Sequence, residues 1–115
     1  MEIHTLALTA AADGTDQADT RAVNGRVLAV FHRPTDLGAG TTLTVTTVVT
    51  EQTILDGVAA GATDKDYFPV TPVHDSDGDP IPATYVHRPA VGEAVRVAIA
   101  GAAESETGNV LVITE

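Results

Sequence analysis

The chain has 115 residues, room for about one domain, with six basic against 16 acidic side chains and a formal net charge of −10. Binding to nucleic acid or to an anionic membrane requires clusters of Lys and Arg, and the sequence has none. We therefore expect no nucleic-acid partner and no membrane partner. The chain also has no Cys, which excludes a disulfide framework, a thiolate zinc site and a cysteine nucleophile.

The apolar residues predict a thin core. They make up 43% of the chain but are mostly Ala and Val, with no Trp, two Phe and two Tyr. Because each buried aromatic removes about 150–250 Å² from water, a core with so few of them depends on many small β-branched contacts. A single domain spanning residues 1–115 would gain stability from a partner surface.

Lys65 is the only lysine beside five arginines, a balance typical of proteins from halophiles, in which molar salt screens acidic self-repulsion. An ordinary acidic mesophilic protein is the alternative. The N-terminus lacks the basic and apolar segments of a signal peptide, and no apolar run approaches the 18 or so residues of a membrane helix. We expect synthesis in the host cytoplasm.

The first half of the chain predicts strands separated by turns. Residues 3–10 alternate, and a polar stretch then reaches Thr20. Residues 27–32 are apolar on both sides, as in a strand between two layers, and residues 33–40 form a turn with one Pro and two Gly. Residues 41–50 are almost wholly Thr and Val, which predicts the clearest strand, with one face made of Leu43, Val45, Thr47 and Val49.

The second half continues the pattern. We expect a short strand at 52–58, a loop at 59–66, and an edge strand or ordered loop at 67–74, where prolines remove ladder donors. A turn-rich insertion at 74–82 precedes an alternating strand at 94–100, a loop at 101–108 and a last strand at 110–114. No window predicts a helix. The fold class is therefore all-β, a single-domain antiparallel β-sandwich of jelly-roll type with about seven to eight strands.

Asp75, Asp77 and Asp79 form the one segment with a possible metal chemistry. Three alternating carboxylates can converge on a hard cation, as at the start of an EF-hand loop. That loop needs Gly at its sixth position and Glu at its twelfth, where this chain has Pro80 and Val86. Asp, Ser and Gly are also common turn formers. We favour a structural turn over a Ca²⁺ or Mg²⁺ site.

The remaining candidates for chemistry are weak. A zinc site needs three or four convergent ligands, whereas the histidines are scattered, although a hairpin could bring His74 near His87. Neither serine lies in a nucleophile elbow, and Gly-Ala-Gly at residues 38–40 precedes no helix pattern. We predict no catalytic residue, no metal ligand and no cofactor. The histidines are His4, His32, His74 and His87, and the serines are Ser76 and Ser105.

Three of the four aromatic side chains flank the acidic turn. Tyr67 and Phe68, followed by Pro69, precede it, and Tyr85 follows it. Two interpretations stay open and are compatible: the rings plug one end of the sandwich, or they form a contact patch, since aromatics are enriched at the centres of interfaces.

Three short motifs occur one after another along the chain. They are Val-Asn-Gly-Arg-Val at residues 23–27, Tyr-Phe-Pro at 67–69 with His74, Asp75 and Gly78, and Arg-Val-Ala-Ile-Ala at 96–100, then Thr107, Gly108 and a strand ending in Glu115. Over roughly residues 20–115 they resemble a family of small virion proteins encoded by tailed viruses of bacteria and archaea. Val70 stands where that family often has Arg, and Glu106 where it usually has Lys. Both departures remove positive charge, as in a halophilic version.

The resemblance implies a structural component of a virus particle with no active site. We expect a non-enzymatic virion protein, located in the particle as an assembly subunit of the capsid surface (decoration or turret) or of the head–tail region. Its partners would be copies of itself, in a ring or trimer, and other virion proteins. The alternative is a non-catalytic β-sandwich module that binds carbohydrate or is linked by Ca²⁺.

Overall fold

The computed structural model describes residues 1–87 and 89–115 and confirms the all-β prediction, because strands and turns but no helix are found there. None of the described residues belongs to a helix long and apolar enough to cross a membrane. The described residues form eleven strands, more than the seven to eight expected, because several are short: β1 (Glu2–Thr9), β2 (Asp16–Asp19), β3 (Val23–Pro34), β4 (Thr42–Thr47), β5 (Thr53–Val58), β6 (Lys65–Tyr67), β7 (Thr71–His74), β8 (Pro80–Val86), β9 (Pro89–Glu93), β10 (Val95–Ala100) and β11 (Thr107–Thr114).

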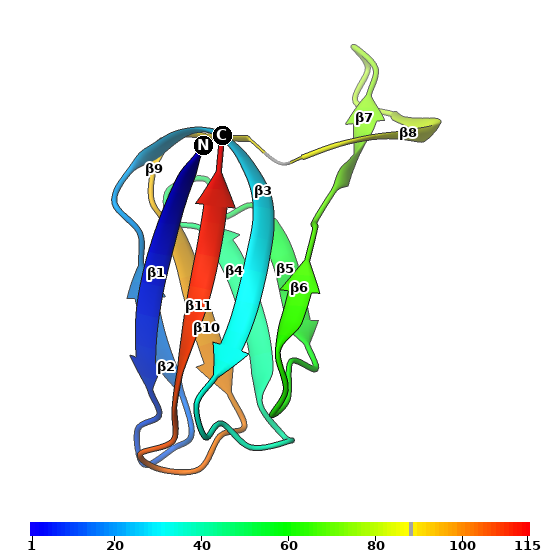
Figure 1. Cartoon of the computed structure of the whole chain (residues 1–115). Helices are drawn as coiled ribbons and strands as arrows, with labels where there is room; N and C mark the ends of the chain where they lie inside the picture. The colour runs from blue at the N-terminus through cyan, green and yellow to red at the C-terminus, as the bar shows by residue number, and fades with distance from the viewer. Residues whose placement is uncertain (88) are drawn as a thin grey trace.

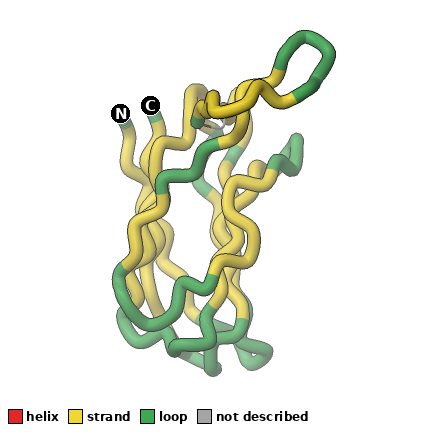
Figure 2. The backbone as a smooth tube through the Cα atoms, turned by 90° about the vertical axis from the view of Figure 1, so that its right-hand side faces the viewer, coloured by secondary structure: helices red, strands yellow, loops and turns green. Residues whose placement is uncertain are grey.

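Two antiparallel sheets form the body of the molecule (Figure 1). The larger sheet has five strands, in the order β1-β11-β3-β6, with β9 also paired to β3. The smaller has four, in the order β2-β10-β4-β5. Figure 2 shows the two layers from the side, with the loops of one end below. This is the two-layer arrangement of a β-sandwich.

The core lies between the sheets and follows from alternation along the strands. Every second residue of β4 and β10 is buried, and the same holds for the first six residues of β11, up to Val112. As predicted, Val95, Val97 and Ile99 point inward. The largest fully buried side chains are Leu8, Val27, Val30, His32, Leu43, Val45, Val95, Val97, Val110 and Val112.

The end of β4 differs from the prediction. We expected the strand to reach residue 50 with Val49 inward, but β4 ends at Thr47 and Val49 is 74% exposed. The buried carboxylate of Glu93 accepts the backbone N–H groups of Val49 at 2.9 Å and Thr50 at 3.0 Å, and the Thr50 hydroxyl at 2.9 Å. These hydrogen bonds keep the pKa of Glu93 below its ordinary value, and the bond from the Thr50 N–H has the largest effect.

Four strands were not predicted from the sequence: β2, β6, β8 and β9. The polar residues 16–19 form β2 at the edge of the smaller sheet, where Asp19 lies opposite Arg96 of β10. The Arg96 guanidinium donates to both carboxylate oxygens of Asp19, at 2.8 and 3.0 Å, and this lowers the pKa of Asp19. Residues 65–67, expected partly as loop, form β6 beside β3. Neither β2 nor β6 has the alternation of apolar residues by which a strand can be recognised from the sequence.

A third, two-stranded sheet stands apart from the body. β7 and β8 pair only with each other and project beyond the end of the sandwich at which both termini lie (Figures 1 and 2). The chain therefore measures 46 × 27 × 22 Å, and its radius of gyration is 14.5 Å, against about 13 Å for a compact chain of this length. We refer to residues 70–87 as the arm.

Candidate protein interaction surface

The arm carries apolar side chains that the rest of the chain does not cover. All seven residues of β8 are exposed. An isolated two-stranded hairpin is marginally stable in water, and sheets normally bury one face against something. The arm buries neither face of β8. Its exposed large apolar side chains are Val70, Ile81, Tyr85 and Val86.

The aromatic residues around the arm separate into two roles. Tyr67 is half-buried and packs against the core, and burial raises the pKa of its hydroxyl. Phe68 and Tyr85, by contrast, are 64% and 61% exposed. The prediction that these rings plug the end of the sandwich is therefore correct for Tyr67 and wrong for Phe68 and Tyr85. Exposed rings of this size favour the contact-patch interpretation.

Hydrogen bonds fix the base of the arm to the body. Pro69 lies where the chain leaves the body, and His87 lies where it returns. The Nδ1–H of His87 donates to the Pro69 carbonyl at 3.1 Å, and Pro69 is buried. Just beyond the return, the side-chain oxygen of Asn24 accepts the Gly92 N–H at 2.7 Å. The arm is thus anchored at its base while its length stays exposed.

Prolines brace the arm along its length. The chain has six prolines, and five of them lie in or beside the arm. Proline fixes φ and removes the N–H donor that a further strand would need, so it stiffens a hairpin and blunts its edges against strand addition. Contacts made by the arm must therefore come chiefly from side chains. These prolines are Pro69, Pro72, Pro80, Pro82 and Pro89.

The acidic segment forms the tip of the arm as a hydrogen-bonded turn. One carboxylate oxygen of Asp75 accepts the N–H of Asp77 at 2.9 Å and of Asp79 at 3.0 Å, and the Gly78 N–H donates to the Asp75 carbonyl. This is the local bonding typical of an Asx turn. Within the described ranges, no three His, Asp or Glu side chains gather as a metal ion requires.

The histidines lie in separate places. Hairpin pairing sets His74 opposite Pro80 and Thr71 opposite Val86, so it does not align His74 with His87. His32 is fully buried, and its Nε2–H donates to the Gly61 carbonyl at 2.9 Å. Ser76 is in the tip of the arm and Ser105 in the loop before β11. No cavity is found in the described structure.

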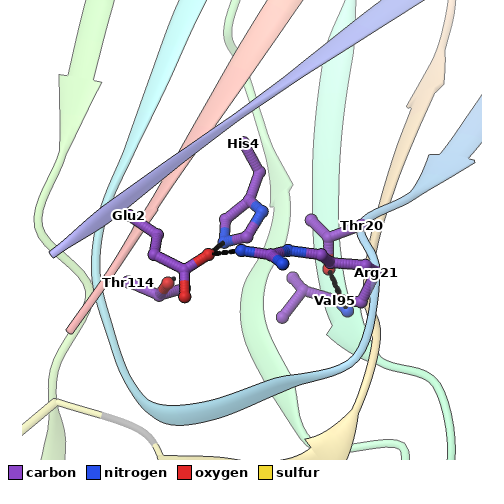
Figure 3. A network of polar contacts seen from close by, with 6 residues as sticks. All are labelled: Glu2, His4, Thr20, Arg21, Val95 and Thr114. Atoms are coloured by element: carbon purple, nitrogen blue, oxygen red, sulfur yellow. Dashed lines mark hydrogen bonds and ion pairs between the residues drawn. The ribbon is translucent and has the colours of Figure 1, made fainter.

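A polar network connects β1, β11 and the residues that follow β2 (Figure 3). His4 Nε2 lies 3.1 Å from the Thr114 hydroxyl and 3.9 Å from Glu2, which is also paired with Arg21. A nucleophile–base–orienter relay would use both ring nitrogens of the histidine. Here both contacts converge on Nε2, and Thr114 is buried. The network holds β1 against β11 and the chain after β2.

Residues in and beside the motifs that resemble the virion family stabilise the fold. Gly25 has φ +132°, and a Cβ there would lie 2.7 Å from the Glu115 carbonyl oxygen. A Cβ on Gly108 would lie 2.6 Å from Leu37. Glu106 accepts the N–H groups of Gly38 at 3.2 Å and Ala103 at 2.7 Å, and so joins two loops.

The chain was compared with known proteins. No protein-family model matches it. The curated proteins likewise include no match.

Proposed function

We propose that this chain is a structural subunit of a tailed-virus particle, on the capsid surface or in the head–tail region, and that it assembles through its arm. The observation that carries the proposal is the arm, a proline-braced hairpin that exposes Val70, Ile81, Tyr85 and Val86 beyond the body. Exposed apolar patches on a small domain mark interaction sites.

Two of the motifs that resemble the virion family, at residues 23–27 and 67–69, lie at the base of this arm. Asn24 and Gly25 secure β3 where β9 returns from the arm, and Tyr67 and Pro69 anchor the chain where it departs. This part of the similarity therefore concerns the structure that presents the arm, and it supports a shared role in assembly.

The net charge of −10 supports a halophilic host. Acidic subunits repel one another at low ionic strength, and at 1 M salt the Debye length falls to about 3 Å. Assembly of this chain is therefore expected in molar salt.

The binding-module alternative has less support. One carboxylate oxygen of Asp75 already accepts two backbone N–H groups, and a sugar site would need a cleft, which the described residues do not form.

Quantitative mass spectrometry of purified virus particles tests the proposal. Particles from a culture that produces this chain should contain its peptides in a fixed ratio to the major capsid protein, and the ratio should persist through repeated density-gradient purification. Presence of the chain only in the soluble fraction of the culture would contradict the proposal.

A further inference from the structure

We propose that β1 pairs edge to edge with β1 of a second copy of this chain, antiparallel and across a two-fold axis. The contact uses a surface different from the arm, so the inference goes beyond the proposed function. It can be tested on the purified protein, whatever the arm binds.

β1 is an edge strand of the larger sheet (Figure 1). It pairs with β11 along all eight of its residues without a register shift, and the described residues place no further strand of that sheet beyond it. Such an edge offers a row of N–H and C=O groups to another strand, and proteins usually protect it with Pro, Lys, a bulge or a short length. The sequence of β1, Glu-Ile-His-Thr-Leu-Ala-Leu-Thr, has none of these features.

The other edges are protected. β2 and β6 have only four and three residues. The pairing of β5 with β4 is interrupted by two register shifts, and Gly57 in β5 has φ +55°. β7, β8 and β9 contain prolines. Of the edges that the structure describes, β1 alone is long, regular and free of proline, so it is the one suited to strand addition.

Two hydrogen bonds establish which groups of β1 face away from β11. The Ala10 N–H donates to the carbonyl of Glu106, just before β11, at 2.8 Å. The preceding N–H, that of Thr9, donates to the carboxylate of Asp16 in β2 at 2.9 Å. Successive residues of an antiparallel strand direct their N–H and C=O groups to opposite sides. The outward groups are therefore those of Ile3, Thr5, Ala7 and Thr9.

The two ends of β1 are fastened, and its middle is free. The carboxylate of Asp16 binds one end, and Arg21 pairs with a side chain at the other. In the described part of the chain, no bond occupies the outward N–H groups of Ile3, Thr5 and Ala7. The side chains of these three residues are exposed as well.

One register satisfies all three free residues on both copies. With Thr5 opposite Thr5 of the second copy, Ile3 lies opposite Ala7, and each pair exchanges two hydrogen bonds. A shift by two residues in one direction places Ile3 opposite Thr9, whose N–H is already bound. The opposite shift places Ala7 opposite Met1, outside β1. The favoured register also gives a cross-strand Thr–Thr pair, which stabilises a sheet.

This register keeps the carboxylates of the two strands apart. β1 contains one carboxylate, Glu2, which is paired with Arg21 and would lie opposite Leu8. Like charges directly opposite each other destabilise a sheet, and this pairing has none. The neighbouring β2 contains Asp16 and Asp19, which bind the Thr9 N–H and Arg96. Molar salt screens the repulsion that remains between the two β2 strands.

The pairing is expected to be weak between free copies. Association removes translational and rotational freedom, and hydrogen bonds along one exposed edge only partly offset that loss. Copies that another contact, such as the arm, already holds together have a high effective concentration, and there the edges should pair. β1 pairing therefore strengthens assembly through the arm and does not replace it.

The absence of Cys from the chain permits a disulfide test that traps even a weak pair and reports its register. Opposite residues of a hydrogen-bonded antiparallel pair have Cα atoms about 5.5 Å apart, within the range of about 4.4–6.8 Å that a disulfide spans. Thr5→Cys should therefore form disulfide-linked dimers on mild oxidation in molar salt. Ala7→Cys, on the same strand and face, is the matched control, because its two cysteines would lie about 13 Å apart along the strands.

A mixture of Ile3→Cys and Ala7→Cys, one of them carrying an affinity tag, should give mixed dimers. Adding Thr5→Pro to both should abolish these dimers, because the proline removes the central outward N–H while the bonds to β11 stay in place. Thr5→Ala should retain them.

Equal dimer yields from Thr5→Cys and Ala7→Cys, or none from either, would overturn the β1 pairing. Detection of the chain in purified particles tests the proposed function separately. Either result can therefore fail while the other stands.

Discussion

The body and the arm of this chain differ in what holds their side chains in place. In the body, two sheets bury Leu43, Val45 and Val97 completely, and Glu93 fastens the turn after β4. In the arm, two strands bond only to each other, and Ile81 and Tyr85 face water. The body is stabilised by its own packing, whereas the arm is stabilised by prolines and by an anchored base.

This difference indicates where stability and function can be changed separately. Substitutions in the body should lower the free energy of unfolding of the monomer. Substitutions in the arm should leave the monomer folded and weaken its assembly. Variants of the two regions should therefore differ in which of these two properties they change.

Leu43→Ala should cause the largest loss of stability. Leu43 is fully buried between the sheets, and truncation of such a residue costs about 2–5 kcal/mol. Chemical denaturation in molar salt would measure the loss. The matched arm variant, Ile81→Ala, removes a side chain that is 38% exposed and should leave the unfolding midpoint of the monomer nearly unchanged. Equal losses would show that the arm is part of the folding unit.

Gly108→Ala should cost less but remain clearly destabilising. The added Cβ would lie 2.6 Å from a side-chain carbon of buried Leu37, and overpacking of this kind typically costs about 1–3 kcal/mol. Gly38→Ala is the control, because its Cβ would meet only the Glu106 carboxylate, at 3.4 Å. Thermal unfolding of both variants should show a drop for Gly108→Ala alone.

Glu93→Gln should weaken the end of β4 and flatten the acid dependence of stability. The N–H donors around Glu93 lower its pKa in the folded state, below the ordinary value of about 4.3. Its stabilising contribution is therefore full above that value and is lost as the pH falls through the folded pKa. Melting temperatures between pH 7 and pH 3 should fall less steeply for the variant, with Glu104→Gln as an exposed control. An unchanged slope would contradict this account.

Pro82→Ala should have the smallest effect, and only on assembly. Replacing a proline in a compatible conformation gives the arm of the unbound monomer more conformational freedom, worth about 0.4–1 kcal/mol, which weakens binding by roughly two- to fivefold. Dilution series followed by light scattering would measure the shift. The monomer's unfolding midpoint should stay nearly constant, and stronger assembly would contradict the bracing role of the prolines.

Alternation in the sequence predicted much of the body. The strands with clear apolar periodicity, β1, β4, β10 and β11, were found close to where they were expected. The short polar strands β2 and β6 were not, since they are held by neighbours such as Arg96 and not by burial. Val49 was misplaced because a distant residue, Glu93, ends β4.

The interaction surface was predictable only in part. The prolines and aromatics between residues 67 and 89 indicated an unusual segment, and a contact patch was one of two open interpretations. Phe68 and Tyr85 are exposed because the hairpin projects from the body. No local sequence pattern predicts that projection.

The central claim is that the chain assembles through its arm, and molar mass by light scattering from low to multi-molar salt tests it most directly. We expect wild-type protein to change from 11.8 kDa monomers to one discrete multiple as salt rises. Tyr85→Asp should remain monomeric throughout, while Tyr85→Phe should assemble like the wild type. A wild-type chain that is monomeric at every salt concentration, or an Asp variant that assembles equally well, would contradict the account.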